Sequence, residues 1–204
     1  SVARDLTHRR ALRYAAGRAV LAASVHNSQP WRFALRDESL ELRADRDRQL
    51  LALDPTGRQL VISCGCALFN ARVALAASGC ESQSTALPDP AQPDLLARIE
   101  IRPRWGVRGS PLAALDEAID SRRTNRREFT TETLPSELLE VLVRSAAAEG
   151  SEVLVIHDAY QRRLLADLTR RAAAIENADP AYRAELSAWT TDDPMRPDGL
   201  QAMS

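Results

Sequence analysis

A short polar segment, Ser24-Val25-His26-Asn27-Ser28-Gln29-Pro30-Trp31, holds side chains that could bind an organic ligand. It gathers hydroxyls, an imidazole and two carboxamides, and its proline disfavours helical geometry at the residue before it. Asn27 and Gln29 each offer donors and acceptors, which suits the edge of a heteroaromatic ring with alternating N–H and C=O groups. The same residue types are common in turns, so a helix end followed by a turn also explains the segment.

A second segment, Ser121-Arg122-Arg123-Thr124-Asn125-Arg126-Arg127-Glu128-Phe129, is rich in arginine. Guanidinium groups bind phosphate through a bidentate fork, and a threonine hydroxyl can add a neutral donor. Such a cluster could hold a phosphomonoester of about −1.5 to −2 charge. The alternative is a solvated arginine run at a helix end, where cations also favour the helix dipole. All 27 basic residues of the chain are arginine, so arginine clusters are expected by composition as well.

The periodicity of the sequence predicts elements that would position these segments. Apolar residues at helical spacing predict a first helix that ends just before the polar segment, and alternation predicts a hairpin just after it. The full set of expected helices is 6–22, 60–78, 111–121, 135–148 and 159–177. The expected strands are 31–35, 40–43, 82–87, 97–101 and 152–156, and a loop is expected at 102–109. The mixture indicates an α+β fold.

The composition limits the possible functions. The chain has 204 residues, 45% of them hydrophobic, and a formal net charge of −1, which gives no overall basic footprint for nucleic acid. Lysine is absent, which excludes a P-loop lysine or a Schiff-base lysine. The three histidines lack metal-ligand spacing, and the three cysteines suggest small buried residues rather than disulfides. No run approaches ~18 uninterrupted apolar residues and no signal core is recognised, so we expect a cytoplasmic protein without a membrane span.

Together the two segments resemble motifs of the nitroreductase-like flavoproteins. Those proteins typically carry an Arg-Arg-Ser-x-Arg phosphate motif and, at the end of the next helix, an Ala-Pro-Ser-x-x-Asn-x-Gln-Pro-Trp loop. Here the loop comes first, and Arg122-Arg123-Thr124-Asn125-Arg126 follows about ninety residues later. The resemblance extends to Asp54-Pro55-Thr56-Gly57-Arg58 and to the segments 62–70 and 75–79. Ala23 stands where the family has proline, and an extra Arg127 leaves the alignment of the phosphate ligands open by one position.

The reversed order resembles the Acg family, in which two nitroreductase-like subunits are fused and share one flavin site. On this interpretation residues 1–110 form a first half that keeps the loop, and residues 111–204 form a second, incomplete half that keeps the arginine motif. Helix end, loop and strand recur at 19–35 and 142–156, as a weak internal repeat would require.

The resemblance implies FMN as the cofactor and no catalytic side chain, because the flavin carries the chemistry. The implied contacts with the ring and ribityl chain are Ser24, His26, Asn27 and Gln29, and those with the phosphate are Arg122, Arg123, Thr124 and Arg126. The implied activity is reduction of nitroaromatics or quinones, a small-molecule substrate, by NAD(P)H, in a possible homo-oligomer. One alternative is flavin binding or sequestration without turnover, under a lid that blocks nicotinamide. Another is a structural remnant that binds no cofactor.

Overall fold

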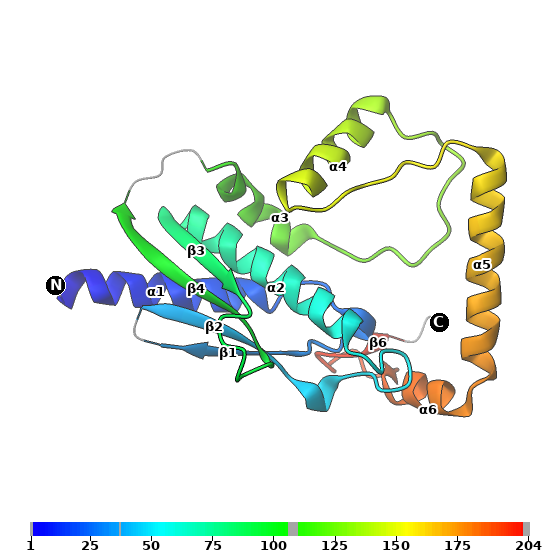
Figure 1. Cartoon of the computed structure of the whole chain (residues 1–204), viewed down its shortest axis with the longest axis horizontal. Coiled ribbons are helices and arrows are strands. Elements are labelled where there is room, and N and C mark those ends of the chain that lie inside the picture. Colours follow the sequence, from blue (N-terminus) through cyan, green and yellow to red (C-terminus); the bar gives the residue numbers. More distant parts are fainter. Residues whose placement is uncertain (1, 37, 106–109, 202–204) are drawn as a thin grey trace. The chain divides into compact units, whose positions relative to one another are not determined.

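The computed structural model describes residues 2–36, 38–105 and 110–201 (Figure 1). These residues form two compact units. Unit 1 comprises residues 1–124 together with 181–204, and unit 2 comprises residues 125–180. The proposed boundary between two sequence halves at residue 110 is a different division of the chain, and it stays a prediction.

Unit 1 is built on a four-stranded antiparallel sheet of order β1-β2-β4-β3 (Figure 1). Its strands are β1 (Trp31–Leu35), β2 (Ser39–Ala44), β3 (Cys80–Ala86) and β4 (Leu95–Trp105). The β1–β2 hairpin pairs Phe33 with Leu42 and Leu35 with Leu40, the register that the alternating sequence predicts. The antiparallel sheet and the helices confirm the α+β fold class.

The two faces of the sheet differ in chemistry. On one face Leu40 and Leu42 pair with Ile99 and Ala97 of β4, and all four are buried. On the other face Glu41 is 5% exposed, and its carboxylate is shared by three arginines. Those arginines are Arg36, Arg43 and Arg98. Burial alone would raise the pKa of Glu41, but hydrogen bonds from Arg43 and Arg98 hold it below the usual range.

Two helices complete the core of unit 1. The helix α1 (Val2–Ala19) packs along α2 (Arg58–Ala77), and both contact the sheet. Their buried positions recur at helical spacing and include many alanines, which allow the helix backbones to approach closely. Before α2, Gly57 adopts a φ of 77°, and Asp54 accepts a hydrogen bond from the Leu60 N–H at 2.9 Å.

By length and composition alone, α2 is also apolar enough to cross a membrane. The core helix of a soluble protein has the same properties, and several residues of α2 are buried in unit 1. Its apolar character is thus accounted for by the core that it forms with α1 and the sheet.

Unit 1 also contains short elements at its periphery. After β4 come a 3₁₀ turn, Pro111–Leu115, and α3 (Asp116–Ser121). The chain returns to unit 1 with α6 (Pro180–Ala188), and the two-residue strands β5 (Thr190–Thr191) and β6 (Leu200–Gln201) pair in parallel. We call residues 189–201 the strap.

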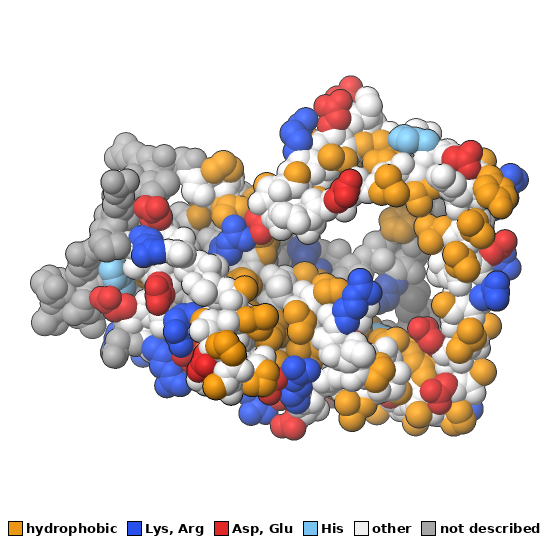
Figure 2. All heavy atoms as spheres, viewed as in Figure 1, with side chains coloured by type: hydrophobic (Ala, Val, Ile, Leu, Met, Phe, Trp, Pro, Cys, Tyr) orange, Lys and Arg blue, Asp and Glu red, His pale blue; other side chains and the backbone are white. Residues whose placement is uncertain are grey.

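Unit 2 contains two amphipathic helices, α4 (Ser136–Ala148) and α5 (Ala159–Ala178). Asp158 caps α5 by accepting a hydrogen bond from the Gln161 N–H at 2.8 Å. Apolar side chains line both helices (Figure 2), yet no residue of unit 2 is buried. Unit 2 therefore has no hydrophobic core of its own.

Several sequence expectations are corrected. Strand β4 runs on to Trp105, so residues 102–105 are not the expected loop, and residues 106–109 lie outside the described part. The expected strand at 152–156 does not form, because these residues pair with no other strand in the described chain. Two of the three cysteines are buried as expected, whereas Cys66 is exposed.

Candidate functional site

The loop between α1 and β1 has a strained backbone. His26, Asn27 and Gln29 have φ values of 47°, 53° and 50°, in the left-handed region that L-residues rarely adopt. Each such residue costs on the order of 1–3 kcal/mol, and such strain gathers at ligand-binding sites. Three of the four residues predicted at the ring end of the site are therefore held in a conformation that a simple turn does not require.

Contacts with the rest of unit 1 hold this loop in place. Ser63 of α2 accepts a hydrogen bond from the Val25 N–H at 3.1 Å. Ser24 accepts one from the Gln29 N–H at 2.9 Å, so the Ser24 hydroxyl closes the turn. Arg48 donates to the Ser28 carbonyl at 2.8 Å. The loop is therefore held by α2 at Val25 and by Arg48 at Ser28.

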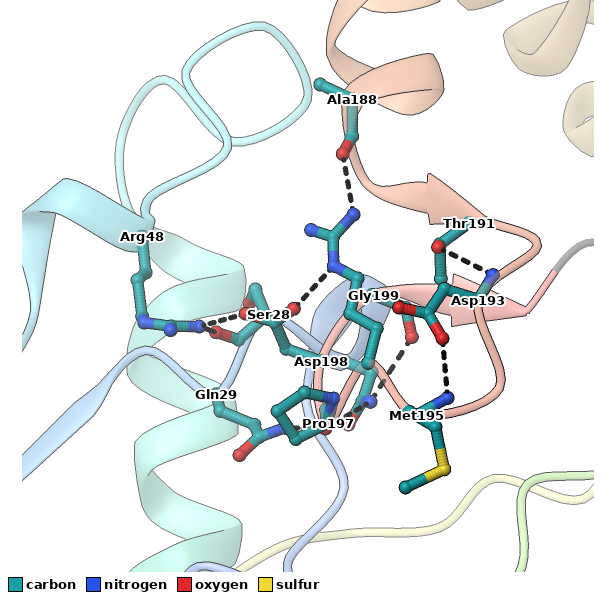
Figure 3. Close-up of polar contacts among 12 residues, drawn as sticks. Ser28, Gln29, Arg48, Ala188, Thr191, Asp193, Met195, Pro197, Asp198 and Gly199 are labelled. Atoms are coloured by element: carbon teal, nitrogen blue, oxygen red, sulfur yellow. Dashed lines mark hydrogen bonds and ion pairs between the residues drawn. The ribbon is translucent and has the colours of Figure 1, made fainter.

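The carboxamides of the loop bind the backbone of the strap (Figure 3). Gln29 Nε2 donates to the Pro197 carbonyl at 2.7 Å. Asn27 Nδ2 donates to the Gly199 carbonyl at 3.2 Å and to that of Pro197 at 3.4 Å. The backbone carbonyl of Asn27 accepts a hydrogen bond from the Gly199 N–H at 3.2 Å. Both side chains therefore point outward from the loop and act as donors to carbonyl oxygens.

Charged groups fasten the strap beside this contact. Asp198 lies 2.8 Å from Arg48 and 2.7 Å from Arg196 (Figure 3). The hydrogen bond from Arg196, together with that from Arg48, holds the pKa of Asp198 below its usual range. Both guanidiniums also lie about 6 Å from the ring centroid of Trp189.

The helix before the strap is anchored separately. The two carboxylate oxygens of Glu185 accept hydrogen bonds from the backbone N–H groups of Ala52 and Leu53, each at 3.0 Å. Charge-assisted bonds of this kind are stronger than neutral ones. Glu185 therefore fixes α6 to the segment between β2 and α2.

Sequence reasoning missed the strap and its partner Arg48. The strap lacks periodicity, so no helix or strand is predicted there. A turn signal was nevertheless present, because Pro197-Asp198-Gly199 matches the Pro-Asp-Gly pattern of tight turns. Gly199 has a φ of 82°, and a Cβ there would lie 2.8 Å from the Trp189 carbonyl oxygen. The Pro-Asp-Gly pattern predicts a turn, but it does not indicate that the turn binds Asn27 and Gln29.

The arginine motif spans the two units. Arg122, Arg123 and Thr124 belong to unit 1, and Arg126 belongs to unit 2. Arg122 lies 3.3 Å from the Thr124 hydroxyl, and Arg123 donates to the Asp120 and Arg122 carbonyls at 2.7 Å. All four motif residues are exposed. The arginine guanidiniums are accessible to an anion, and within the described part of unit 1 no hydrogen bond or ion pair joins Arg122, Arg123 or Thr124 to the loop.

Arg18 ties the helix that leads into this motif to the end of α1. It binds the carboxylate and the carbonyl of Asp116 and lies 2.7 Å from Asp120, both on α3. Its own carbonyl accepts from Asn70 Nδ2 of α2 at 3.3 Å. Asn70 follows the loop contact Ser63 by seven residues, so the two anchor points share one stripe of α2 about 10 Å apart.

Comparison with known proteins finds relatives over most of the chain. Over 171 residues, 83% of this chain, the sequence is 37% identical to a Mycobacterium tuberculosis protein named "Putative NAD(P)H nitroreductase acg". A second protein of that organism, also named "Putative NAD(P)H nitroreductase", is 37% identical over 172 residues, 84% of this chain. The chain is a homologue of proteins named as nitroreductases. These matches show that the chain is similar to nitroreductase-like proteins over most of its own length.

The nitroreductase homologues are longer than this chain. The aligned residues cover 50% of the protein named acg and 48% of the second protein. A third relative of the same organism, named only as uncharacterized, is 35% identical over 174 residues and is covered to 50%. No family model matches the sequence. The chain thus spans about half the length of the curated relatives that it matches.

Proposed function

We propose that this chain is the FMN-binding part of an NAD(P)H-dependent oxidoreductase that reduces nitroaromatics or quinones. The observation that carries the proposal is the strained loop, whose two carboxamides donate hydrogen bonds to a carbonyl oxygen. The names of the homologues support NAD(P)H as the reductant and nitroreduction as the reaction. The fusion of two nitroreductase-like halves is part of the same proposal.

The residues of the loop suit the polar edge of an isoalloxazine ring. That edge alternates C=O and N–H groups, and a carboxamide can bind both. Gln29 and Asn27 already hold the Pro197 carbonyl oxygen at 2.7 and 3.4 Å, so their geometry suits a carbonyl ligand. Ser24 and His26 complete the ring end as half-buried polar residues.

The phosphate end of the cofactor would lie at the arginine motif. Arg122, Arg123, Thr124 and Arg126 offer exposed donors, and a guanidinium fork matches phosphate oxygens. When bound, the flavin would accept a hydride from NAD(P)H and pass electrons to the substrate, while these residues bind and orient it.

The test is a titration of the purified protein with FMN, followed by the absorption and fluorescence of the flavin. We expect binding to wild type, and loss of at least tenfold in affinity for Asn27→Leu and for Arg122→Met. Gln83→Leu is the matched control, because Gln83 is exposed on β3, away from the site. A protein that leaves the FMN spectrum unchanged would refute the proposal.

The reaction is tested by adding NADH or NADPH without oxygen. Bleaching of bound flavin, followed by its recovery on addition of a nitroaromatic or a quinone, is the expected result. Flavin that stays yellow with both nucleotides would instead establish the alternative of flavin binding without turnover.

A further inference from the structure

The donors that the proposed ligand requires are occupied by the chain itself. A carboxamide NH₂ group has two hydrogens to donate. Asn27 directs its NH₂ group to the Pro197 and Gly199 carbonyls, and Gln29 directs its own to Pro197 (Figure 3). Asn27 therefore has no hydrogen left for another acceptor while the strap is in place.

We propose that the strap is a built-in competitor, whose Pro197 carbonyl occupies the place of a ring carbonyl of the ligand. This inference rests on the proposed function, in which the ligand is the flavin. The ring can reach Asn27 and Gln29 only after the strap has left the loop. Binding of the cofactor and docking of the strap then exclude each other.

The interactions that hold the strap against the loop are weak enough for a reversible competitor. Asp198 is 17% exposed in its side chain and Arg48 is 38% exposed, so their ion pair is only partly shielded from water. Ion pairs with this much exposure to water contribute little to stability. The contact between the strap and the loop is otherwise made of hydrogen bonds. A ring carbonyl can replace the Pro197 or Gly199 carbonyl as an acceptor, and a ring N–H can replace the Gly199 N–H as the donor to the Asn27 backbone carbonyl.

The strap also has a defined conformation, in which Gly199 packs against the Trp189 carbonyl. Gly199 adopts a left-handed φ of 82°, and its missing side chain leaves room for the Trp189 carbonyl oxygen. The Leu200 N–H donates to that same carbonyl at 2.7 Å. A side chain at position 199 would push against this oxygen, so substitution there distorts the strap itself and weakens its contact with Asn27, without changing a donor of the loop.

The experiment compares FMN affinity in wild type and in two variants that release the strap. Gly199→Ala distorts the strap at the Trp189 carbonyl, and Asp198→Asn weakens the ion pairs of the strap with Arg48 and Arg196. Gly150→Ala is the matched control, because Gly150 also has a positive φ but faces open space. We expect FMN to bind the two strap variants about three- to tenfold more tightly than wild type, because the binding-competent fraction rises. The control should bind as wild type does.

Hydrogen exchange of residues 189–201 provides a second readout. If the strap competes, exchange in this segment becomes faster when FMN is added to wild type. Equal or weaker binding by both strap variants, or slower exchange on FMN addition, would overturn the competition while leaving FMN binding intact. If no protein binds FMN, including Gly199→Ala, the competition and the proposed function both fail.

Discussion

Replacement of Arg18 by methionine should destabilise unit 1 more than any other single arginine substitution on α1. Its side chain is 12% exposed and binds Asp116, which is 17% exposed. A hydrogen bond to a charged group contributes about 1.5–3 kcal/mol. The pair with Asp120, which is 66% exposed, adds at most about 1 kcal/mol. Methionine keeps an apolar stem but leaves Asp116 without its cation, so we expect a loss of about 3 kcal/mol.

The assay is thermal unfolding followed by tryptophan fluorescence. All three tryptophans of the sequence belong to unit 1, so the signal reports this unit alone. For a protein of this size a loss of 3 kcal/mol lowers Tm by about 6–12 °C. Arg10→Met is the control, because Arg10 is exposed on the same helix. A change of less than 2 °C for Arg18→Met would show that the anchoring of α3 is energetically unimportant, and the reasoning would be wrong.

Three further predictions concern charge and reactivity. Glu41 and Asp198 have lowered pKa values, so their contribution to stability is complete above their ordinary values near 4 and is lost as the pH falls through the lowered ones. Unfolding followed from pH 7 to pH 2 should therefore show a loss of stability that begins below about pH 4; a loss already complete at pH 5 would contradict this. A thiol reagent should modify Cys66 in the folded protein and the other two cysteines only after unfolding, as mass spectrometry can determine. Glu185→Gln should lower the free energy of unfolding by about 1–2 kcal/mol and speed amide exchange at residues 52 and 53. The exposed Glu132→Gln serves as its control, and identical exchange in the two variants would refute the anchor.

The cysteine prediction has a physical basis in burial. Cys64 lies within 3.3 Å of the Pro30 carbonyl in the core of unit 1. Burial raises the pKa of its thiol to about 12, so the reactive thiolate is scarce at neutral pH.

Local patterns in the sequence predicted much of unit 1. The alternation of 31–35 and 40–43 predicted the hairpin, and Leu40 and Leu42 are buried on the face that this alternation indicates. The apolar stripe that ends before Gly79 identified α2, and the buried residues of this helix recur at helical spacing. The two strands of the hairpin are close in sequence, and the buried residues of α2 follow one clear periodicity. Both signals can be read from the local sequence.

What the sequence could not predict depends on distant partners. Val153 and Leu154 have the composition of a strand, but a strand needs a partner to receive its hydrogen bonds, and none pairs with them in the described chain. The loop at Asn27 was recognised as polar and shaped, yet its partner in the strap lies about 170 residues away. No local periodicity records such a pairing.

The absence of a core in unit 2 has a consequence for how the whole chain responds to heat or denaturant. Cooperativity comes from buried contacts that are lost together, and no residue of 125–180 is buried. The helices α4 and α5 should therefore melt gradually, as helix–coil transitions that start at their ends. Circular dichroism, which sums over all helices, will then give a broader transition than tryptophan fluorescence, and one melting temperature will describe unit 1 only.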